Sequence, residues 1–406
     1  MHVKTIHIVF RIGFLILVHL SLRAQVPEQK KSVWKNMQLN GYVKNLTSVI
    51  VPPNSSSSLT NEWMSDNLLH QRFNYWWFIN NNLKLEAAMR NRLYFGEAQK
   101  LKYTFLPGYL ESMESDPSWL DLTSVVASDT SYLLHTTFDR LNFQGTFGKI
   151  EIRLGRQRIN WGTSLVWNPN DIFNAYSLFD FDYEERPGTD AGAIKYYLNS
   201  SANVEAVYAP SDSLKGSSTA IKYQFNKAGY DWQGFAGFQK GFWVAGGGWA
   251  GEIKGAGFRG EFTQFVPAFD YIPFESQLVA TVDFDYTFNN SLRLSGSYLY
   301  NSEGLDTKEG NYGAFFVNRQ LSAQLLSPSM HSIYAGAGYQ FAPMFYGNFF
   351  TILNPSDLSF FLGPAASYTV SNNFEVMLTA QFFSGTPNTA YGDYGSQYYL
   401  RFKWNF

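Results

Sequence analysis

Cysteine is absent from the 406 residues of the chain. This absence excludes disulfide bonds, a lipid-modified N-terminal cysteine, thiolate metal ligands and cysteine nucleophiles. Beyond residue 24 the chain also lacks any run of about 18 apolar residues, the length that a membrane-spanning helix requires. Charged residues make up only 16% of the chain, against roughly 25% in soluble globular proteins. These shortages argue against a helical membrane protein and against an ordinary soluble one.

Aromatic residues, by contrast, are abundant. The chain has 36 Phe, 26 Tyr and 11 Trp, together 18% of its residues, and its mean hydropathy is −0.21. Strands and membrane-interface girdles both use aromatic side chains heavily. A transmembrane barrel gives a mean hydropathy near zero because lipid-facing and lumen-facing residues alternate along each strand. The composition therefore favours one large β architecture.

Residues 1–24 have the pattern of a cleaved signal peptide. Lys4 and Arg11 supply the positive region, residues 12–22 form the apolar core, and cleavage is expected near Ala24. Removal of this segment leaves 28 of the 31 basic residues against 33 acidic ones, a net charge near −5. We expect no nucleic-acid partner for such a chain.

Few side chains in the exported chain are suited to catalysis. Only His70, His135 and His331 remain, on separate predicted strands, and neither a GxSxG nor an HExxH motif is present. Asp283 and Asp285 lie two residues apart on one predicted strand, a spacing that is common among polar residues that merely line the lumen of a barrel. We therefore expect no enzyme, no metal site and no cofactor. A hydrolytic barrel that uses His135 or Asp283 is the least favoured alternative.

Period-two alternation is the main structural signal. The clearest case is 278–288, in which an apolar row starting at Leu278 and ending at Phe288 alternates with Thr281, Asp283, Asp285 and Thr287. Similar segments recur along the whole chain, mostly about 10 to 14 residues long, as a tilted membrane strand requires. They predict an all-β, transmembrane, antiparallel up-and-down β-barrel of about 18 strands, with 16 also compatible. The predicted strands begin near residues 37, 67, 83, 132, 149, 191, 202, 219, 230, 242, 257, 277, 291, 331, 345, 358, 373 and 396.

The predicted connections alternate between short turns and long loops. Short turns fall at 80–81, 147–148, 199–201, 289–290, 342–343 and 371–373, and longer loops at 99–130, 162–189, 304–330 and 384–394. An even number of strands, with both ends of the chain in the periplasm, places the long loops outside the cell. Residues 25–36 form only a short periplasmic segment before a barrel over 37–406. Such a segment cannot hold the large plug of an active transporter, so a passive channel is expected.

The alternation changes phase within the strand that starts at Lys149. Ile150, Ile152 and Leu154 are expected to face lipid and Arg153 the lumen, but Arg156 and Arg158 then fall on the lipid-facing parity. A charge at mid-bilayer costs about 2–4 kcal/mol. Either a bulge at Gly155 turns both arginines into the lumen, or they lie above the membrane at the rim.

A long segment follows at 162–189, rich in aromatic and acidic side chains. In one interpretation it folds into the barrel, where its carboxylates face Arg153, Arg156 and Arg158 and form a charged constriction. In the other it caps the outside of the barrel. The aromatic residues of the segment either stack on solutes or pack the loop against the wall. The candidate constriction residues are Arg153, Arg156, Arg158, Trp161, Asp171, Glu184, Glu185 and Arg186.

The motifs around this segment resemble a signature of substrate-specific and alginate-export-like porins. They are Gly155-Arg156-Gln157-Arg158, then Trp161-Gly162, then Asn168-Pro169-Asn170-Asp171. A related outer-membrane family without an assigned function has a similar pattern. The resemblance implies a channel in which an arginine ladder and an inward loop set selectivity.

The last segment ends on an unbroken apolar row. Tyr398, Leu400, Phe402, Trp404 and Phe406 alternate with residues such as Arg401 and Lys403, which we expect to face the lumen together with Asp283 and Asp285. The row resembles the C-terminal signal read by the barrel-assembly machinery of Gram-negative bacteria.

Taken together, these patterns predict an outer-membrane porin for passive, charge-selective passage of small solutes, surrounded by lipid and lipopolysaccharide. The alternative is a non-conducting barrel whose loops at 99–130 and 304–330 bind a protein partner in a surface or secretion complex.

Overall fold

A computed structural model describes residues 36–53, 63–116, 118–175, 185–186, 188–270, 275–307 and 322–406. Strands dominate these ranges, and no helix within them is long and apolar enough to cross a membrane. The predicted signal peptide and the short segment after it lie outside the described residues. The strands are β1 (Met37–Val51), β2 (Met64–Phe78), β3 (Leu83–Phe95), β4 (Thr123–Asp129), β5 (Tyr132–Phe147), β6 (Ile150–Gln157), β7 (Thr189–Tyr197), β8 (Asn203–Ala209), β9 (Ser218–Lys227), β10 (Tyr230–Gln239), β11 (Phe242–Ile253), β12 (Ala256–Pro267), β13 (Gln277–Thr287), β14 (Arg293–Asn301), β15 (His331–Ala342), β16 (Phe345–Leu353), β17 (Phe360–Ser371), β18 (Phe374–Ser384) and β19 (Ser396–Asn405).

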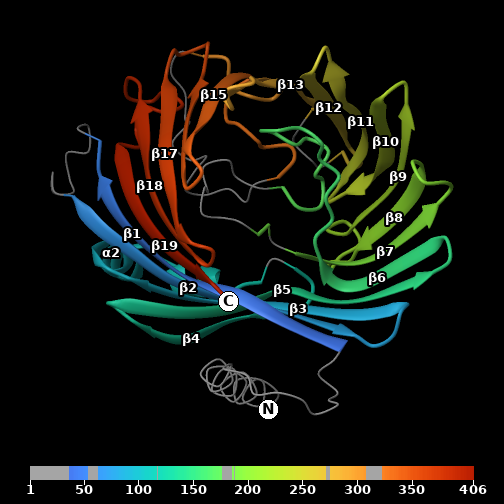
Figure 1. Ribbon diagram of the computed structural model, residues 1–406, viewed down its shortest axis with the longest axis horizontal. Helices are drawn as coiled ribbons and strands as arrows, with labels where there is room; N and C mark the ends of the chain where they lie inside the picture. The colour runs from blue at the N-terminus through green and yellow to red at the C-terminus, as the bar shows by residue number, and fades with distance from the viewer. Residues whose placement is uncertain are drawn as a thin grey trace.

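The strands form a closed antiparallel barrel of 18 strands, with β4 as one extra strand. Closure is made by β1 and β19, which pair from Tyr42 opposite Asn405 to Val51 opposite Ser396. Two backbone hydrogen bonds of 3.0 Å between Gly41 and Phe406 extend this pairing to the last residue of the chain. Figure 1 shows the resulting ring viewed along the barrel. The prediction of about eighteen strands in an all-β barrel is confirmed.

The segment predicted as a loop at 99–130 contains regular structure that the alternation did not indicate. It holds helices α2 (Glu97–Phe105) and α3 (Tyr109–Glu114) as well as β4. Gly96, with φ +123°, turns the chain into α2, and Glu97 and Lys102 place opposite charges at the two ends of that helix, where each is favoured. The prediction of one long loop at 99–130 was therefore wrong, because short helices and a seven-residue strand give too weak a periodicity to detect.

Alternation along each strand separates a lipid-type exterior from a polar lumen. On β13, Phe284 and Tyr286 are exposed on the outside, whereas Thr281 and Asp283 are buried on the lumen side. The last strand follows the same rule, with Tyr398, Phe402 and Trp404 exposed on the outer face. The outer faces of these two strands thus present apolar side chains to lipid.

The buried core lies inside the barrel. The residues that follow β6 enter the central space and pack against the inner walls of the strands opposite, as Figure 1 shows for the green segment in the middle of the ring. Ile159, Trp161, Val166, Trp167 and Ile172 from this segment form one hydrophobic cluster with lumen-facing side chains of the wall. The described part of the predicted 162–189 segment is therefore folded into the lumen and does not cap the barrel.

Candidate functional site: the lumen and its inward loop

Gly155 lies within β6 and has a backbone conformation that L side chains rarely adopt. Its φ is +109°, which glycine adopts readily, and a Cβ at this position would overlap the carbonyl oxygen of Leu141. The register of β6 against β5 is continuous through Gly155. Of the two alternatives for Arg156 and Arg158, the bulge at Gly155 is therefore wrong. The bulge lies in β5 at Asp139, where the pairing with β3 shifts.

Glu261 on β12 is the main anchor of the inward loop, which we define as residues 158–175. Its carboxylate accepts hydrogen bonds from the backbone N–H groups of Thr163, Ser164 (2.7 Å) and Asn170 (3.1 Å). On the neighbouring strand, Asp283 accepts one more from the backbone N–H of Leu165 at 3.0 Å. The inward loop has no helix or strand in which its backbone N–H groups could be paired. Glu261 and Asp283 of the wall accept hydrogen bonds from four of these groups instead.

Trp161 packs inside the inward loop and does not face the channel. Its side chain is 1% exposed, its ring lies 5.2 Å from that of Phe173 and 5.4 Å from that of Phe235, and its Nε1 donates to Glu205 at 3.1 Å. Lys222 lies 5.1 Å from the ring centre. Of the two interpretations for the aromatic residues, packing describes Trp161.

Asp171 holds the two ends of the inward loop together. One carboxylate oxygen accepts from the backbone N–H groups of Trp161 and Gly162, both at 2.7 Å, and the other lies 2.5 Å from Arg186. Burial raises the pKa of the Asp171 carboxyl above its usual range, against the opposing charge of Arg186. The motif residues Trp161, Gly162 and Asp171 therefore meet in space, as a turn closed by one buried carboxylate.

Arg156 lies in the wall itself, 3% exposed. Its guanidinium donates to both carboxylate oxygens of Asp190 at 2.9 Å, to Asp116 at 2.7 Å and to the carbonyl of Leu120 at 2.5 Å. Within the described residues, β4 pairs only with β5, so the wall between β4 and β7 has no backbone ladder. Arg156 bridges this gap in the wall through its ion pairs with Asp116 and Asp190, and we call these three residues the seam.

Asp116 is the member of the seam that lies outside the strands. Burial favours its neutral form, but hydrogen bonds from Arg156 and from the backbone N–H groups of Ser118 and Leu122 outweigh this and lower the pKa of the Asp116 carboxyl below its usual range. A lowered pKa means that the folded state prefers the carboxylate. Its contribution to stability is complete above the unfolded pKa of about 3.9 and is lost as the pH falls through the folded value.

Replacing Asp116 with asparagine is therefore expected to remove part of the acid sensitivity of the barrel. Thermal unfolding followed by circular dichroism at about pH 7 and below about pH 3 measures this. The wild type should lose about 1–3 kcal/mol more stability on acidification than Asp116→Asn. The exposed Asp121→Asn serves as control and should behave as the wild type. Equal acid sensitivity of wild type and Asp116→Asn would contradict the assignment.

The other predicted arginines, and Glu185 with them, are more exposed than Arg156. Arg153 lies 2.8 Å from Glu151 on the lumen side of β6, with its side chain 32% exposed. Arg158 donates to Asn160 at 3.4 Å. Glu185 is 43% exposed and lies 3.7 Å from Arg140. Glu184 is outside the described residues. The segment that follows the inward loop thus brings a carboxylate toward arginines, but toward a different set from the predicted one.

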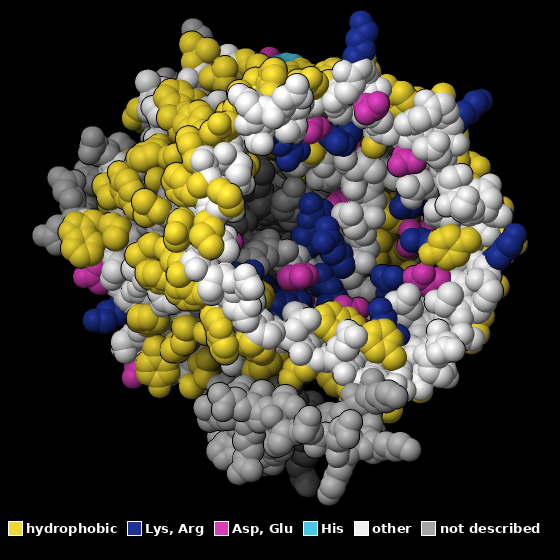
Figure 2. Space-filling view, in the orientation of Figure 1, with side chains coloured by type: hydrophobic (Ala, Val, Ile, Leu, Met, Phe, Trp, Pro, Cys, Tyr) yellow, Lys and Arg dark blue, Asp and Glu magenta, His cyan; other side chains and the backbone are white. Residues whose placement is uncertain are grey.

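That different set is a basic wall on β19, β1, β2, β3 and β5, of which the sequence predicted only Arg401 and Lys403 as lumen-facing. Asp139 receives ion pairs from Arg72 and, at 2.5 Å, from Arg90. Arg92 contacts only the ring nitrogen Nδ1 of His135, at 2.9 Å, and the face of a tyrosine, and no carboxylate among the described residues pairs with it. In Figure 2, blue side chains gather in the hollow centre of the ring. The basic wall comprises Lys44, Arg72, Arg90, Arg92, Arg140, Arg401 and Lys403.

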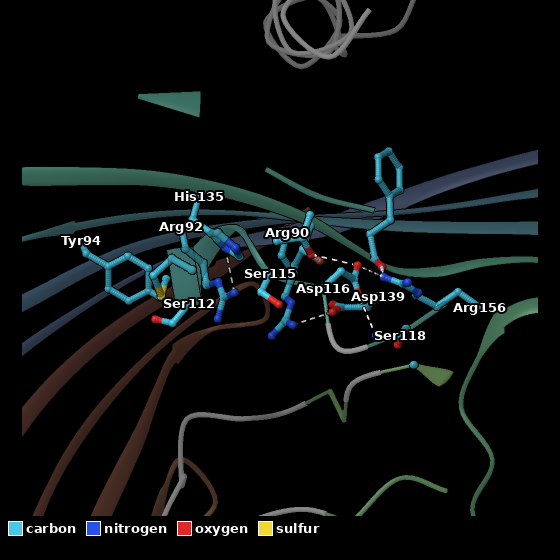
Figure 3. A pocket seen from close by; sticks show the side chains of 15 residues that line it. Arg90, Arg92, Tyr94, Ser112, Ser115, Asp116, Ser118, His135, Asp139 and Arg156 are labelled. Carbon is cyan, nitrogen blue, oxygen red and sulfur yellow. Dashed lines mark hydrogen bonds and ion pairs between the residues drawn. The ribbon is translucent and has the colours of Figure 1, made fainter. Parts of the chain in front are cut away.

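Helix α3 leans over this wall and encloses a cavity of about 260 Å³. Ser112 and Ser115 lie on its helix side, and Arg90, Arg92 and His135 on its strand side. Figure 3 shows these side chains converging from the α3 segment, β3 and β5. The signal that could have found the wall is period-two spacing of basic residues, His70 with Arg72 and Arg90 with Arg92, on neighbouring strands.

The remaining predicted lumen residues also point inward. Asp285 lies 2.5 Å from Arg259 and 3.2 Å from Arg293. Arg401 lies 2.5 Å from Glu375, and the Lys403 ammonium lies 4.8 Å from the centre of the Tyr42 ring. No cluster of side chains suited to hold a metal ion occurs within the described ranges.

No protein-family model matches the chain, and no curated protein matches its sequence significantly. Solved structures do match its fold. The outer membrane protein OprD of Pseudomonas aeruginosa aligns with a TM-score of 0.58 at 9% identity, over 93% of this chain and 95% of that one. OccAB3 of Acinetobacter baumannii aligns with a TM-score of 0.53 at 11% identity, over 91% and 99%. OccK11 of Pseudomonas aeruginosa gives 0.55 at 8% identity, over 92% and 96%. The chain therefore has the 18-strand barrel fold of the OprD and Occ outer-membrane porins.

Proposed function

We propose that the protein is a passive channel for small solutes in the outer membrane of a Gram-negative bacterium, with a preference for anions. The proposal rests on a difference between the acidic and the basic side chains of the lumen. Glu261 and Asp283 are occupied by backbone groups of the inward loop, whereas Arg92 has no carboxylate partner among the described residues. The open side of the lumen is thus lined mainly by cations.

The inward loop supplies the narrowing that an 18-strand barrel needs in order to select solutes. A barrel of this size leaves an aqueous channel unless a segment fills part of it. The loop contacts the inner faces of β8 to β13, so solutes would pass on the other side of the lumen, next to the basic wall. Charged side chains lining a narrow pore attract ions of opposite sign and repel ions of the same sign.

We assign two roles to the predicted site residues. Trp161, Asp171 and Arg186 support the inward loop, and Arg156 secures the wall, so these residues act on the shape of the channel. Arg153, Arg158 and Glu185 belong with Arg401 and Lys403 to the charged lining that a solute meets. Asp283 and Asp285 position the loop and the arginines beside it.

Replacing Arg92 with glutamine is expected to lower the preference for anions, because it removes a cation without leaving a carboxylate unpaired. Reversal potentials of the protein in planar bilayers under a KCl gradient measure this, and the permeability ratio of chloride to potassium should fall clearly. The control is Lys227→Gln, an exposed cation at a hairpin away from the basic wall, which should leave the ratio unchanged. Equal ratios for Arg92→Gln and the wild type would reject the role of the basic wall.

Export and assembly complete the proposal. Residues 1–24 act as the cleaved signal peptide, and 25–36 remain in the periplasm. The outward row Tyr398, Leu400, Phe402, Trp404 and Phe406 is the segment that the barrel-assembly machinery would bind. The same face then lies against lipid and lipopolysaccharide.

A further inference from the structure

We propose that the lumen contains a niche for a neutral sugar ring, between the inward loop and β14 to β16. The niche rests on the proposed function only for access to the lumen and is separate from the basic wall. It is a cavity of about 240 Å³, smaller than the roughly 300–1,000 Å³ of sites for drug-sized ligands and thus suited to a single ring. Its lining includes Leu165, Val166, Arg293, Tyr334, Tyr346 and Phe350.

Glycines leave room on the wall for the aromatic side chains of the niche. The place that a Cβ of Gly338 would take is occupied by the hydroxyl end of Tyr346, and the place above Gly363 by the ring of Phe350. The lining of the niche therefore combines three aromatic side chains, Tyr334, Tyr346 and Phe350, against which another ring can pack.

The aromatic side chains of the niche form the accessible end of a longer aromatic row. Tyr334 and Phe350 have ring centres 5.8 Å apart, and Phe350 and Phe361 have centres 5.4 Å apart. Phe361 is fully buried, so a solute cannot reach the row beyond Phe350. Tyr346 is 37% exposed and stands at the open end.

Most polar groups of the niche are neutral side chains. Arg293, the one cation of its lining, lies 3.2 Å from Asp285, a carboxylate that it shares with Arg259. Ser295, Asn348 and the tyrosine hydroxyls contribute both donors and acceptors. A sugar presents donors and acceptors around an uncharged ring with apolar C–H faces, which matches the aromatic faces and the side chains of Leu165 and Val166. An anion would instead prefer the basic wall.

The test compares D-glucose with sorbitol, a linear polyol that carries hydroxyls but no ring. Glucose should reduce the ion current through the reconstituted protein in a concentration-dependent way, and sorbitol should not. Tyr346→Ala should weaken the effect of glucose about fivefold to tenfold, the loss expected for one aromatic face. Its KCl conductance should stay close to that of the wild type. The control is Tyr368→Ala on the outer face of β17, where Tyr368 is exposed.

Three outcomes would overturn the sugar niche: equal effects of glucose and sorbitol, equal glucose affinity in Tyr346→Ala and Tyr368→Ala, or a stronger block by benzoate that depends on Tyr346. The third outcome would indicate an aromatic acid as the occupant. Saturation-transfer NMR of glucose on the detergent-solubilised full chain measures binding without ion flow. A protein that does not conduct but binds glucose through Tyr346 would reject the channel and keep the niche.

Discussion

Replacing Glu261 with alanine is expected to release the inward loop and to raise the single-channel conductance well above the wild-type value. The substitution leaves the backbone N–H groups of Thr163, Ser164 and Asn170 without their acceptor. Each buried donor left unsatisfied costs about 1–3 kcal/mol, so the loop loses most of its preference for the lumen. Recordings in planar bilayers measure the conductance, and limited proteolysis of the loop reports its release.

Two further variants make this prediction specific. Glu261→Gln retains one carbonyl acceptor and should give an intermediate conductance. Glu252→Ala removes an exposed carboxylate at the end of β11 and should change nothing. Wild-type conductance in Glu261→Ala would show that the loop does not depend on this anchor.

The second large effect is expected for Arg156→Ala, and it should appear in stability more than in ion selectivity. The change leaves the carboxylates of Asp190 and Asp116 without their ion-pair partner, and their side chains are only 3% and 4% exposed. Removing one partner of a buried ion pair costs about 3–5 kcal/mol because a charge stays buried without compensation. The barrel should therefore unfold at a clearly lower temperature, as followed by its heat-dependent migration in gels.

Arg153→Ala provides the matched control on the same strand. Arg153 has a half-open ion pair with Glu151, for which a loss below about 1 kcal/mol is expected. Arg156→Lys keeps the charge but cannot reach two carboxylates and the carbonyls of Leu120 and Phe138 at once, so it should fall between Arg156→Ala and the wild type. Equal stability of Arg156→Ala and Arg153→Ala would reject the seam.

Much of the fold could be predicted because strand alternation is a local property. In Leu278 to Phe288, neighbouring residues alone separate the lipid-facing row from the lumen-facing row, and short turns fix the pairing of consecutive strands. The extra strand β4 and the two helices before it escaped prediction. Their periodicity is short, and their positions depend on contacts such as Lys102 with Asp66, 2.9 Å apart.

The site was less predictable because its parts come from distant strands. Chemistry and spacing singled out the Gly155 to Asp171 region. The carboxylates that hold it, Glu261 and Asp283, lie far along the chain, and no motif in the residues around them indicates this role. Arg156 fell on the lipid-facing parity, and only the gap between β4 and β7 explains how a charge is tolerated there. The basic wall depends on the register between β1, β2 and β3, where Lys44 stands opposite His70 and His70 opposite Arg92.

The most direct test of the proposed channel is the ion current through the purified wild-type chain in planar bilayers under a KCl gradient. We expect discrete conductance steps and a reversal potential that shows a preference for chloride over potassium. Absence of steps in membranes that demonstrably contain the folded barrel, or a preference for potassium, would contradict an anion-selective channel lined by the basic wall.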